Sequence, residues 1–111
     1  MSLIRACGLA EVPEGTAIPV ELEGADIAIV RSEGRVYAIA DQCSHAAIPL
    51  SEGDVIASEI ECYLHGSTFD LRTGKPTTFP ATEPVATFPA EVRDGDVYVD
   101  VDTTLNGVTP A

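Results

Sequence analysis

The sequence is short of positive charge: it has 6 Lys and Arg against 18 Asp and Glu, a formal net charge of −12 at pH 7. Nucleic acid and anionic membrane surfaces carry the same sign of charge and would repel such a chain. We therefore expect neither as a partner. The acidic excess itself has two interpretations, a solvated surface that maintains solubility or an acidic face that steers encounters with basic patches on partner proteins.

The sequence also lacks any run of about 18 apolar residues, the length that crosses a bilayer as a helix. Its first residues contain one Arg and a short apolar segment that Gly8 and Glu11 interrupt, which is not the pattern of a secretory signal. We therefore expect the protein in the cytoplasm. At 111 residues and 11.6 kDa, the chain has room for one domain and for no second catalytic domain.

Cysteine and histidine are scarce as well, with 3 and 2 residues. Two of the cysteines and both histidines lie in the stretch from Cys43 to His65, so Cys7 has no partner and a disulfide framework is excluded. A reducing compartment fits this pattern. Cys7 falls in an expected strand, where it would pack as a small apolar side chain.

The stretch reads Cys43-x-His45, then sixteen residues, then Cys62-x-x-His65. Each pair offers a thiolate and an imidazole from adjacent residues, as a loop does when it folds over a metal. The donors alone leave two candidates, a tetrahedral structural zinc or a two-iron, two-sulfur cluster in which two histidines replace two cysteines on one iron. Zinc fingers usually pair Cys with Cys and His with His, so the mixed pairs favour iron.

The rest of the chain predicts an all-β protein. Its 8 Pro and 9 Gly break it into short runs in which apolar and polar residues alternate. The prolines from Pro76 to Pro89 predict an extended segment, and the tail after Asp102 is expected to be mobile or held only at Leu105. Strands are expected at Leu3–Cys7, Val20–Glu23, Ile27–Arg31, Arg35–Ala40, Ile56–Cys62, Thr68–Asp70, Ala90–Arg93 and Val97–Val101, with tight turns at Ser32–Gly34 and Asp94–Asp96.

The chain resembles the Rieske family, and within it the small ferredoxins of bacterial ring-hydroxylating oxygenase systems. The likeness is carried by Cys43-x-His45, Cys62-x-x-His65-Gly66-Ser67, Phe69-Asp70 and Thr73-Gly74-Lys75-Pro76. It implies the Rieske fold, an antiparallel β-sandwich base with a small cluster-binding subdomain of two hairpin-like loops. We expect one Rieske domain over residues 1–102, with the subdomain at about 41–81 and a mobile tail at 103–111.

The resemblance also implies one Rieske-type [2Fe-2S] cluster and its ligands. Cys43 and Cys62 would bind one iron, while His45 and His65 would bind the second iron, nearer to solvent. Two imidazoles in place of two thiolates raise the reduction potential above that of an all-cysteine cluster.

Further residues would surround this cluster. The backbone at Gly66 would approach it and donate an N–H, unless the glycine serves only the turn. The hydroxyl of Ser67 would donate to a bridging sulfide, unless it is an ordinary turn serine. Leu64 would either join the apolar cover or point into the core. The cover would otherwise be formed by Ile48, Pro49 and Pro80.

Three positions bear on the reduction potential. High-potential Rieske proteins of respiratory complexes carry a disulfide between the positions that are Ile48 and Leu64 here, and a tyrosine at the position of Phe69. Without the tyrosine hydroxyl, one hydrogen bond to a cysteine sulfur is missing. We therefore predict a potential in the lower part of the Rieske range, which spans about −150 to +300 mV.

With both histidines bound to the cluster, none remains for a mononuclear iron site or as a general base, so no enzyme activity is expected. The resemblance implies a monomeric one-electron carrier between an NAD(P)H-dependent flavoprotein reductase and a terminal ring-hydroxylating oxygenase. Two alternatives stay open. One is an electron-transfer accessory of another system, similar to the small subunit of nitrite reductase or linked to iron-sulfur cluster assembly. The other is a zinc-stabilised binding module.

Overall fold

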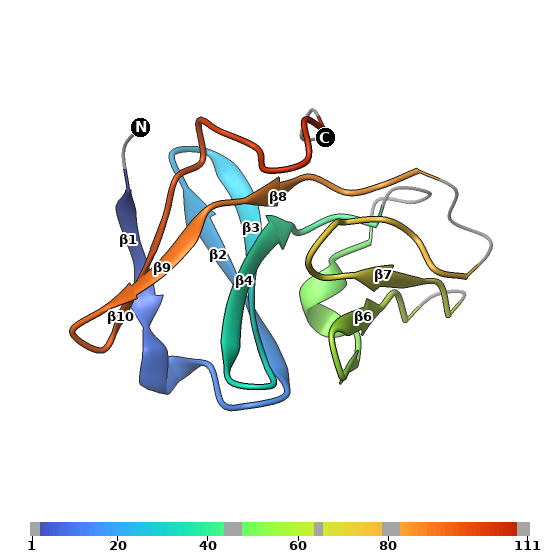
Figure 1. Cartoon of the computed structure of the whole chain (residues 1–111), viewed down its shortest axis with the longest axis horizontal. Coiled ribbons are helices and arrows are strands. Elements are labelled where there is room, and N and C mark those ends of the chain that lie inside the picture. Colours follow the sequence, from blue (N-terminus) through green and yellow to red (C-terminus); the bar gives the residue numbers. More distant parts are fainter. Residues whose placement is uncertain (1–2, 44–47, 64–65, 79–82, 109–111) are drawn as a thin grey trace.

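The strands of the protein form three antiparallel sheets (Figure 1). The structure is a computed structural model that describes residues 3–43, 48–63, 66–78 and 83–108. The sheets have the strand orders β1-β10-β9, β2-β3-β4-β8 and β5-β6-β7, which confirms the predicted all-β fold. The strands are β1 (Ile4–Gly8), β2 (Thr16–Leu22), β3 (Ala25–Ser32), β4 (Arg35–Ala40), β5 (Val55–Ile56), β6 (Glu59–Glu61), β7 (Thr68–Asp70), β8 (Thr87–Phe88), β9 (Ala90–Arg93) and β10 (Asp96–Val99), with short 3-10 helices η1 (Leu9–Glu11) and η2 (Leu50–Glu52).

The two predicted tight turns are confirmed. Glu33 and Gly34 join β3 to β4 with φ of +52° and +76°, and Asp94 and Gly95 join β9 to β10 with φ of +50° and +82°. Two consecutive residues with positive φ twist a hairpin in the direction that its strands require. Strand β2 is longer than predicted and includes Pro19, which an edge strand of the sheet tolerates because its outer N–H groups need no partner.

The prediction of one strand from Ile56 to Cys62 is wrong, because the chain reverses inside it. Strands β5 and β6 pair with each other across a turn at Ala57, whose φ is +54°. Nothing in the local sequence marks this turn, since alanine seldom adopts positive φ. The turn is held from outside, by a hydrogen bond from the Ser32 hydroxyl at the end of β3 to the Ala57 carbonyl.

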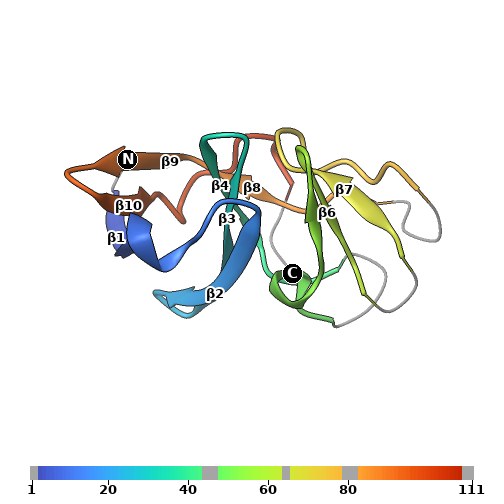
Figure 2. The same cartoon turned by 90° about the horizontal axis from the view of Figure 1, so that it is seen from below.

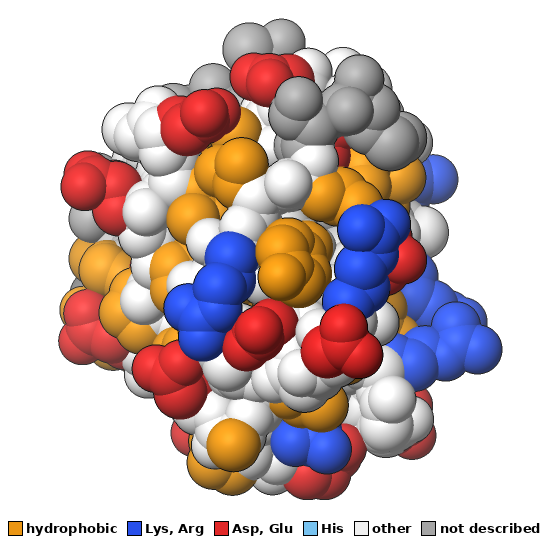
Figure 3. Space-filling model, turned by 90° about the vertical axis from the view of Figure 1, so that its left-hand side faces the viewer, with side chains coloured by type: hydrophobic (Ala, Val, Ile, Leu, Met, Phe, Trp, Pro, Cys, Tyr) orange, Lys and Arg blue, Asp and Glu red, His pale blue; other side chains and the backbone are white. Residues whose placement is uncertain are grey.

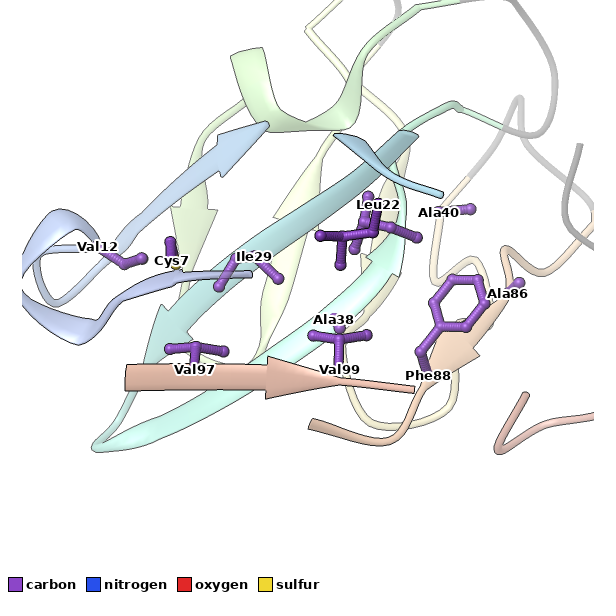
Figure 4. Close-up of a cluster of buried hydrophobic side chains, with 11 residues drawn as sticks. Cys7, Val12, Leu22, Ile29, Ala38, Ala40, Ala86, Phe88, Val97 and Val99 are labelled. Atoms are coloured by element: carbon purple, nitrogen blue, oxygen red, sulfur yellow. The ribbon is translucent and has the colours of Figure 1, made fainter. Parts of the chain in front are cut away.

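Both faces of the middle sheet are buried, which explains the continuous apolar run of β3. Ile27 and Ile29 belong to a core shared with the β1-β10-β9 sheet, while Ala28 and Val30 belong to a second core on the other face. Successive side chains of a strand point to opposite faces, so one strand serves both cores. Figure 4 shows the first core, whose labelled members are Cys7, Val12, Leu22, Ile29, Ala38, Ala40, Ala86, Phe88, Val97 and Val99.

Cys7 packs in this first core, as predicted. Its side chain is 4% exposed, and burial raises the pKa of the Cys7 thiol because the apolar surroundings disfavour the thiolate. The thiol therefore stays protonated and behaves as a small apolar group.

The second core lies between the middle sheet and the β5-β6-β7 sheet. Both views of the fold place β6 and β7 beyond the middle sheet, away from β1, β9 and β10 (Figures 1 and 2). The β1-β10-β9 sheet lies at the opposite end of the molecule, where basic and acidic side chains are interspersed (Figure 3), and it contains Arg5 and Arg93. Arg5 pairs there with Asp96 at 3.2 Å and Arg93 with Glu91 at 2.9 Å. These pairs are exposed and contribute little to stability.

The C-terminal tail follows the edge of the middle sheet. The Leu105 N–H donates to the Thr87 carbonyl at 2.7 Å, but the Leu105 side chain is 64% exposed. Asn106 makes further hydrogen bonds, to Val85 and Thr73 among others. The prediction that the tail is held only at Leu105 is therefore wrong. Among the described residues, no helix is long and apolar enough to span a membrane.

Candidate metal centre

The structure brings Cys43 and Cys62 into one buried region. Their side chains are 2% and 0% exposed, and both belong to the second core. His45 and His65 lie outside the described residues, so the full ligand set stays a prediction. The apolar residues that share this core with the two cysteines are Ala28, Val30, Ile39, Leu50, Ile60, Phe69, Leu71 and Val85.

The loop after Cys43 is closed at its base by two sets of contacts. The Cys43 N–H donates to the Ile48 carbonyl at 2.8 Å. Asp41, just before the loop, accepts hydrogen bonds from the Ser51 N–H at 2.7 Å and the Ser51 hydroxyl at 2.8 Å. Both ends of the loop are therefore fixed. Strand β4, which its neighbouring strands hold in place, leads into the end of the loop that begins at Cys43.

The loop after Cys62 is closed in the same way. The Cys62 N–H donates to the Ser67 carbonyl at 2.6 Å, and the Gly66 N–H donates to the Cys62 carbonyl at 3.0 Å. Gly66 has φ of +75°, a conformation that glycine adopts without strain. Its N–H is used inside the loop, and its role toward a cluster stays a prediction.

The two loops share one backbone pattern although their motifs differ in spacing. In each, the cysteine N–H bonds the carbonyl five residues later, Ile48 for Cys43 and Ser67 for Cys62. Each histidine of the sequence motif falls between those two ends. Both cysteines therefore begin loops that the same type of hydrogen bond closes, which is how a pair of equivalent ligand loops would be built.

The remaining predicted site residues have mixed outcomes. Ser67 is fully buried at the end of the second loop, and Ile48 is partly buried against the second core. Thr78, whose hydroxyl donates to the Gly66 carbonyl at 3.4 Å, brings the following chain beside this loop. Leu64 and Pro80 lie outside the described residues, so their roles stay predictions.

Comparison with known proteins identifies this arrangement. The Rieske [2Fe-2S] domain matches residues 2–89. The chain belongs to this family. The 3-phenylpropionate/cinnamic acid dioxygenase ferredoxin subunit of Escherichia coli (strain K12) is 41% identical over 102 residues, which cover 91% of this chain and 95% of the relative. The predicted resemblance is thereby confirmed, and the protein carries a Rieske-type [2Fe-2S] cluster.

Two solved Rieske structures are similar over nearly the whole chain. The ferredoxin of carbazole 1,9a-dioxygenase from Nocardioides aromaticivorans IC177 has a TM-score of 0.84 and 36% identity, covering 89% of this chain and 97% of that one. A chain in a complex of reduced oxygenase and oxidized ferredoxin in carbazole 1,9a-dioxygenase has a TM-score of 0.82 and 37% identity, covering 87% of this chain and 91% of that one.

The described part of this Rieske domain fits such a cluster. Two buried thiol side chains lie in an apolar core, and an apolar shell limits solvent access and thereby tunes a cluster's potential. Two thiolates would also balance the charge of the oxidised [2Fe-2S] core. Among the described residues, no three His, Cys, Asp or Glu gather as a metal site.

Sequence reasoning missed the residues that hold the loops of this Rieske domain in place. Asp41 and Ser51 tie the two ends of the first loop, and Ser32 fixes the β5-β6 turn. No local motif marks these residues, because each pairs with a group ten or more positions away.

Gly53 lies at the close approach between the η2 helix and strand β6, which leads into Cys62. A Cβ at Gly53 would lie 1.6 Å from the Glu61 carbonyl oxygen. We expect Gly53→Ala to destabilise the protein by about 2 to 3 kcal/mol, because a backbone contact cannot move aside. Urea unfolding followed by circular dichroism would measure this.

Gly8→Ala is the matched control for Gly53→Ala. The φ of Gly8 is −77°, and a methyl group added there would have as its nearest neighbour the movable Glu11 carboxylate, at 3.2 Å. This variant should change the free energy of unfolding by less than about 1 kcal/mol. Equal stabilities of the two variants would contradict the packing argument.

Proposed function

We propose that this Rieske domain is the ferredoxin component of a ring-hydroxylating oxygenase system. It accepts one electron from an NAD(P)H-dependent flavoprotein reductase and passes it to a terminal oxygenase. The observation that carries the proposal is the alignment with a dioxygenase ferredoxin subunit over 95% of that relative's length at 41% identity. Because the match is end to end, the likeness is to a whole ferredoxin subunit rather than to one domain of a larger enzyme.

The proposed ligands are Cys43 and Cys62 on one iron and His45 and His65 on the other. The two buried cysteines, each beginning a loop closed by the same hydrogen bond, support this assignment. When bound, the cluster supplies one-electron redox chemistry. We place the cluster-binding subdomain at about residues 41–81, within the single domain.

Neither the two histidines nor Cys7 is available for a second chemistry. The sequence has 2 histidines, and both belong to the proposed ligand set. Cys7 is buried in the first core, and its raised pKa keeps the thiol protonated. No histidine is therefore left as a general base and no reactive thiolate at Cys7, which supports a carrier rather than an enzyme.

The surface beside the first cysteine loop suits a basic partner. A hollow there is lined by Asp26, Asp41, Gln42, Ile48 and Pro49, and the Tyr63 side chain after the second cysteine is 52% exposed. Carboxylates around a partly apolar surface favour fast, short-lived encounters with positively charged surfaces. The rate of electron transfer to the oxygenase should therefore fall as salt screens these charges.

Reconstitution tests the proposal. The purified protein should contain iron and acid-labile sulfide and give the absorption and electron paramagnetic resonance spectra of a Rieske cluster. With NADH, a flavoprotein ferredoxin reductase and a ring-hydroxylating terminal oxygenase, product should form only when this protein is added.

Other outcomes of the reconstitution point elsewhere. A colourless protein that holds one zinc ion would overturn the redox assignment in favour of a binding module. A loaded cluster that accepts electrons but never reduces an oxygenase would favour an accessory of another redox system, of the nitrite reductase or cluster-assembly kind. Sedimentation would test the predicted monomer.

A further inference from the structure

We propose that Asn106 is a positioning residue for the cluster. Its side-chain amide locks the turn that follows the second cysteine loop to the segment that pairs with β4, the strand that leads to Cys43. The inference rests on the proposed function, because it takes Cys43 and Cys62 as ligands. The family match ends at residue 89, so Asn106 lies beyond it.

The amide nitrogen of Asn106 joins two segments that are far apart in the sequence. It donates to the Thr73 carbonyl at 2.9 Å and to the Val85 carbonyl at 2.8 Å. The amide oxygen accepts from the Thr87 N–H and the Val108 N–H, each at 3.3 Å. All the hydrogen-bonding groups of this side chain are thus used, and three of its four partners lie outside the tail.

The first of these segments continues from the second cysteine loop. Strand β7 follows that loop, and the turn after β7 contains Thr73 and Gly74. The Gly74 N–H donates back to the Asp70 carbonyl at 2.7 Å, so the turn is rigidly attached to β7. Fixing the Thr73 carbonyl therefore fixes the Asp70 end of β7, which is one strand of the hairpin that carries Cys62.

The other segment, residues 85–88, lies against the strand that leads to Cys43. The Ala40 N–H donates to the Ala86 carbonyl at 2.9 Å, and Ile39 of β4 pairs with Thr87 of β8. Val85, in turn, donates its N–H to the Gly74 carbonyl at 2.8 Å. Residues 85–88 thus lie between β4 on one side and, on the other side, the turn at Thr73 and Gly74 together with the Asn106 side chain.

Gly74, Val85 and Asn106 are packed too closely for their contacts to shift. A Cβ at Gly74 would lie 2.1 Å from the Val85 carbonyl oxygen and 2.7 Å from the Asn106 amide nitrogen. Val85 and Thr87 are buried, so their backbone groups have little access to water if Asn106 is removed. Loss of the amide would leave the Val85 carbonyl and the Thr87 N–H without their Asn106 partner and loosen the junction between the two cysteine loops.

The test uses two variants of the full-length, cluster-loaded protein. Asn106→Ala removes all four hydrogen bonds, and Asn106→Asp keeps the shape and an acceptor but loses the donors to Thr73 and Val85. Both should release the cluster to an excess of iron chelator about tenfold faster than the unmodified protein. The paramagnetic resonance lines of the reduced cluster should broaden, because its surroundings become heterogeneous.

Leu105→Ala is the matched control. It changes the neighbouring residue, whose side chain is 64% exposed, and keeps the backbone bond to Thr87. It should release the cluster within about twofold of the unmodified rate, with unchanged line widths. The proposal is overturned if both Asn106 variants release the cluster at the same rate as Leu105→Ala and give the same spectra. If the variants lower only the midpoint of urea unfolding, the proposal is also overturned, and Asn106 is a simple anchor of the tail.

A measurement on the unmodified protein guards against variants that fail to fold. Hydrogen exchange of the Thr87 and Leu105 amides should be as slow as that of the Ala40 amide. The hydrogen bonds of Asn106 would hold the tail against the middle sheet, to which Ala40 belongs. Fast exchange at both positions would overturn the proposal. If the unmodified protein binds no cluster at all, the proposed function fails instead, which separates the two failures.

Discussion

Replacing Cys62 with alanine is expected to abolish cluster binding. Cys62 is fully buried at the end of β6 and begins the second closed loop. Without its thiolate, one iron loses half of its proposed protein ligands. The variant should lose its iron and sulfide and its visible absorption. Its thermal midpoint should also fall to that of the cluster-free chain, because a bound metal group stabilises only the folded state.

The control for this change is Cys7→Ala. Cys7 is also a buried thiol, at 4% exposure, but it belongs to the first core, apart from the core that holds Cys43 and Cys62. Both substitutions remove one sulfur from an apolar interior, so the costs in packing should be similar. The prediction is refuted if Cys62→Ala binds as much iron as Cys7→Ala and has the same spectrum.

Phe69→Tyr is expected to raise the reduction potential by about 40 to 60 mV, because a new hydrogen bond to a cysteine sulfur would strengthen by about 1 to 1.5 kcal/mol when the cluster is reduced. Phe69 is fully buried in the core that holds both cysteines. A hydroxyl there has sulfur ligands as its candidate partners. Protein-film voltammetry of the loaded protein would measure the shift.

Phe88→Tyr provides the comparison for the potential. Phe88 is 2% exposed but lies in the first core, so it receives the same added hydroxyl away from the cysteines. Its potential should equal that of the unmodified protein, although a buried hydroxyl without a partner would lower its stability by about 1 to 3 kcal/mol. No rise in Phe69→Tyr with a full iron content would count against this account of the tuning.

The agreement between sequence and structure is best where the signal is local. The turns at Glu33–Gly34 and Asp94–Gly95 were predictable because each contains a glycine, which adopts positive φ without strain. The turn at Ala57 was not, because an alanine gives no such mark and a hydrogen bond from Ser32 holds it. The same distinction applies to Asn106, whose partners lie in two distant segments.

By itself, the sequence determined the class of protein and the identity of the candidate ligands. Two mixed Cys and His pairs at a set spacing specify a donor chemistry, and alternating apolar residues specify strands, since both depend only on neighbours along the chain. Tertiary structure alone decided which residues hold those ligands in place. Asp41 meets Ser51, and Asn106 meets Thr73 and Val85, because folding brings these side chains to backbone groups that lie ten or more positions away along the chain.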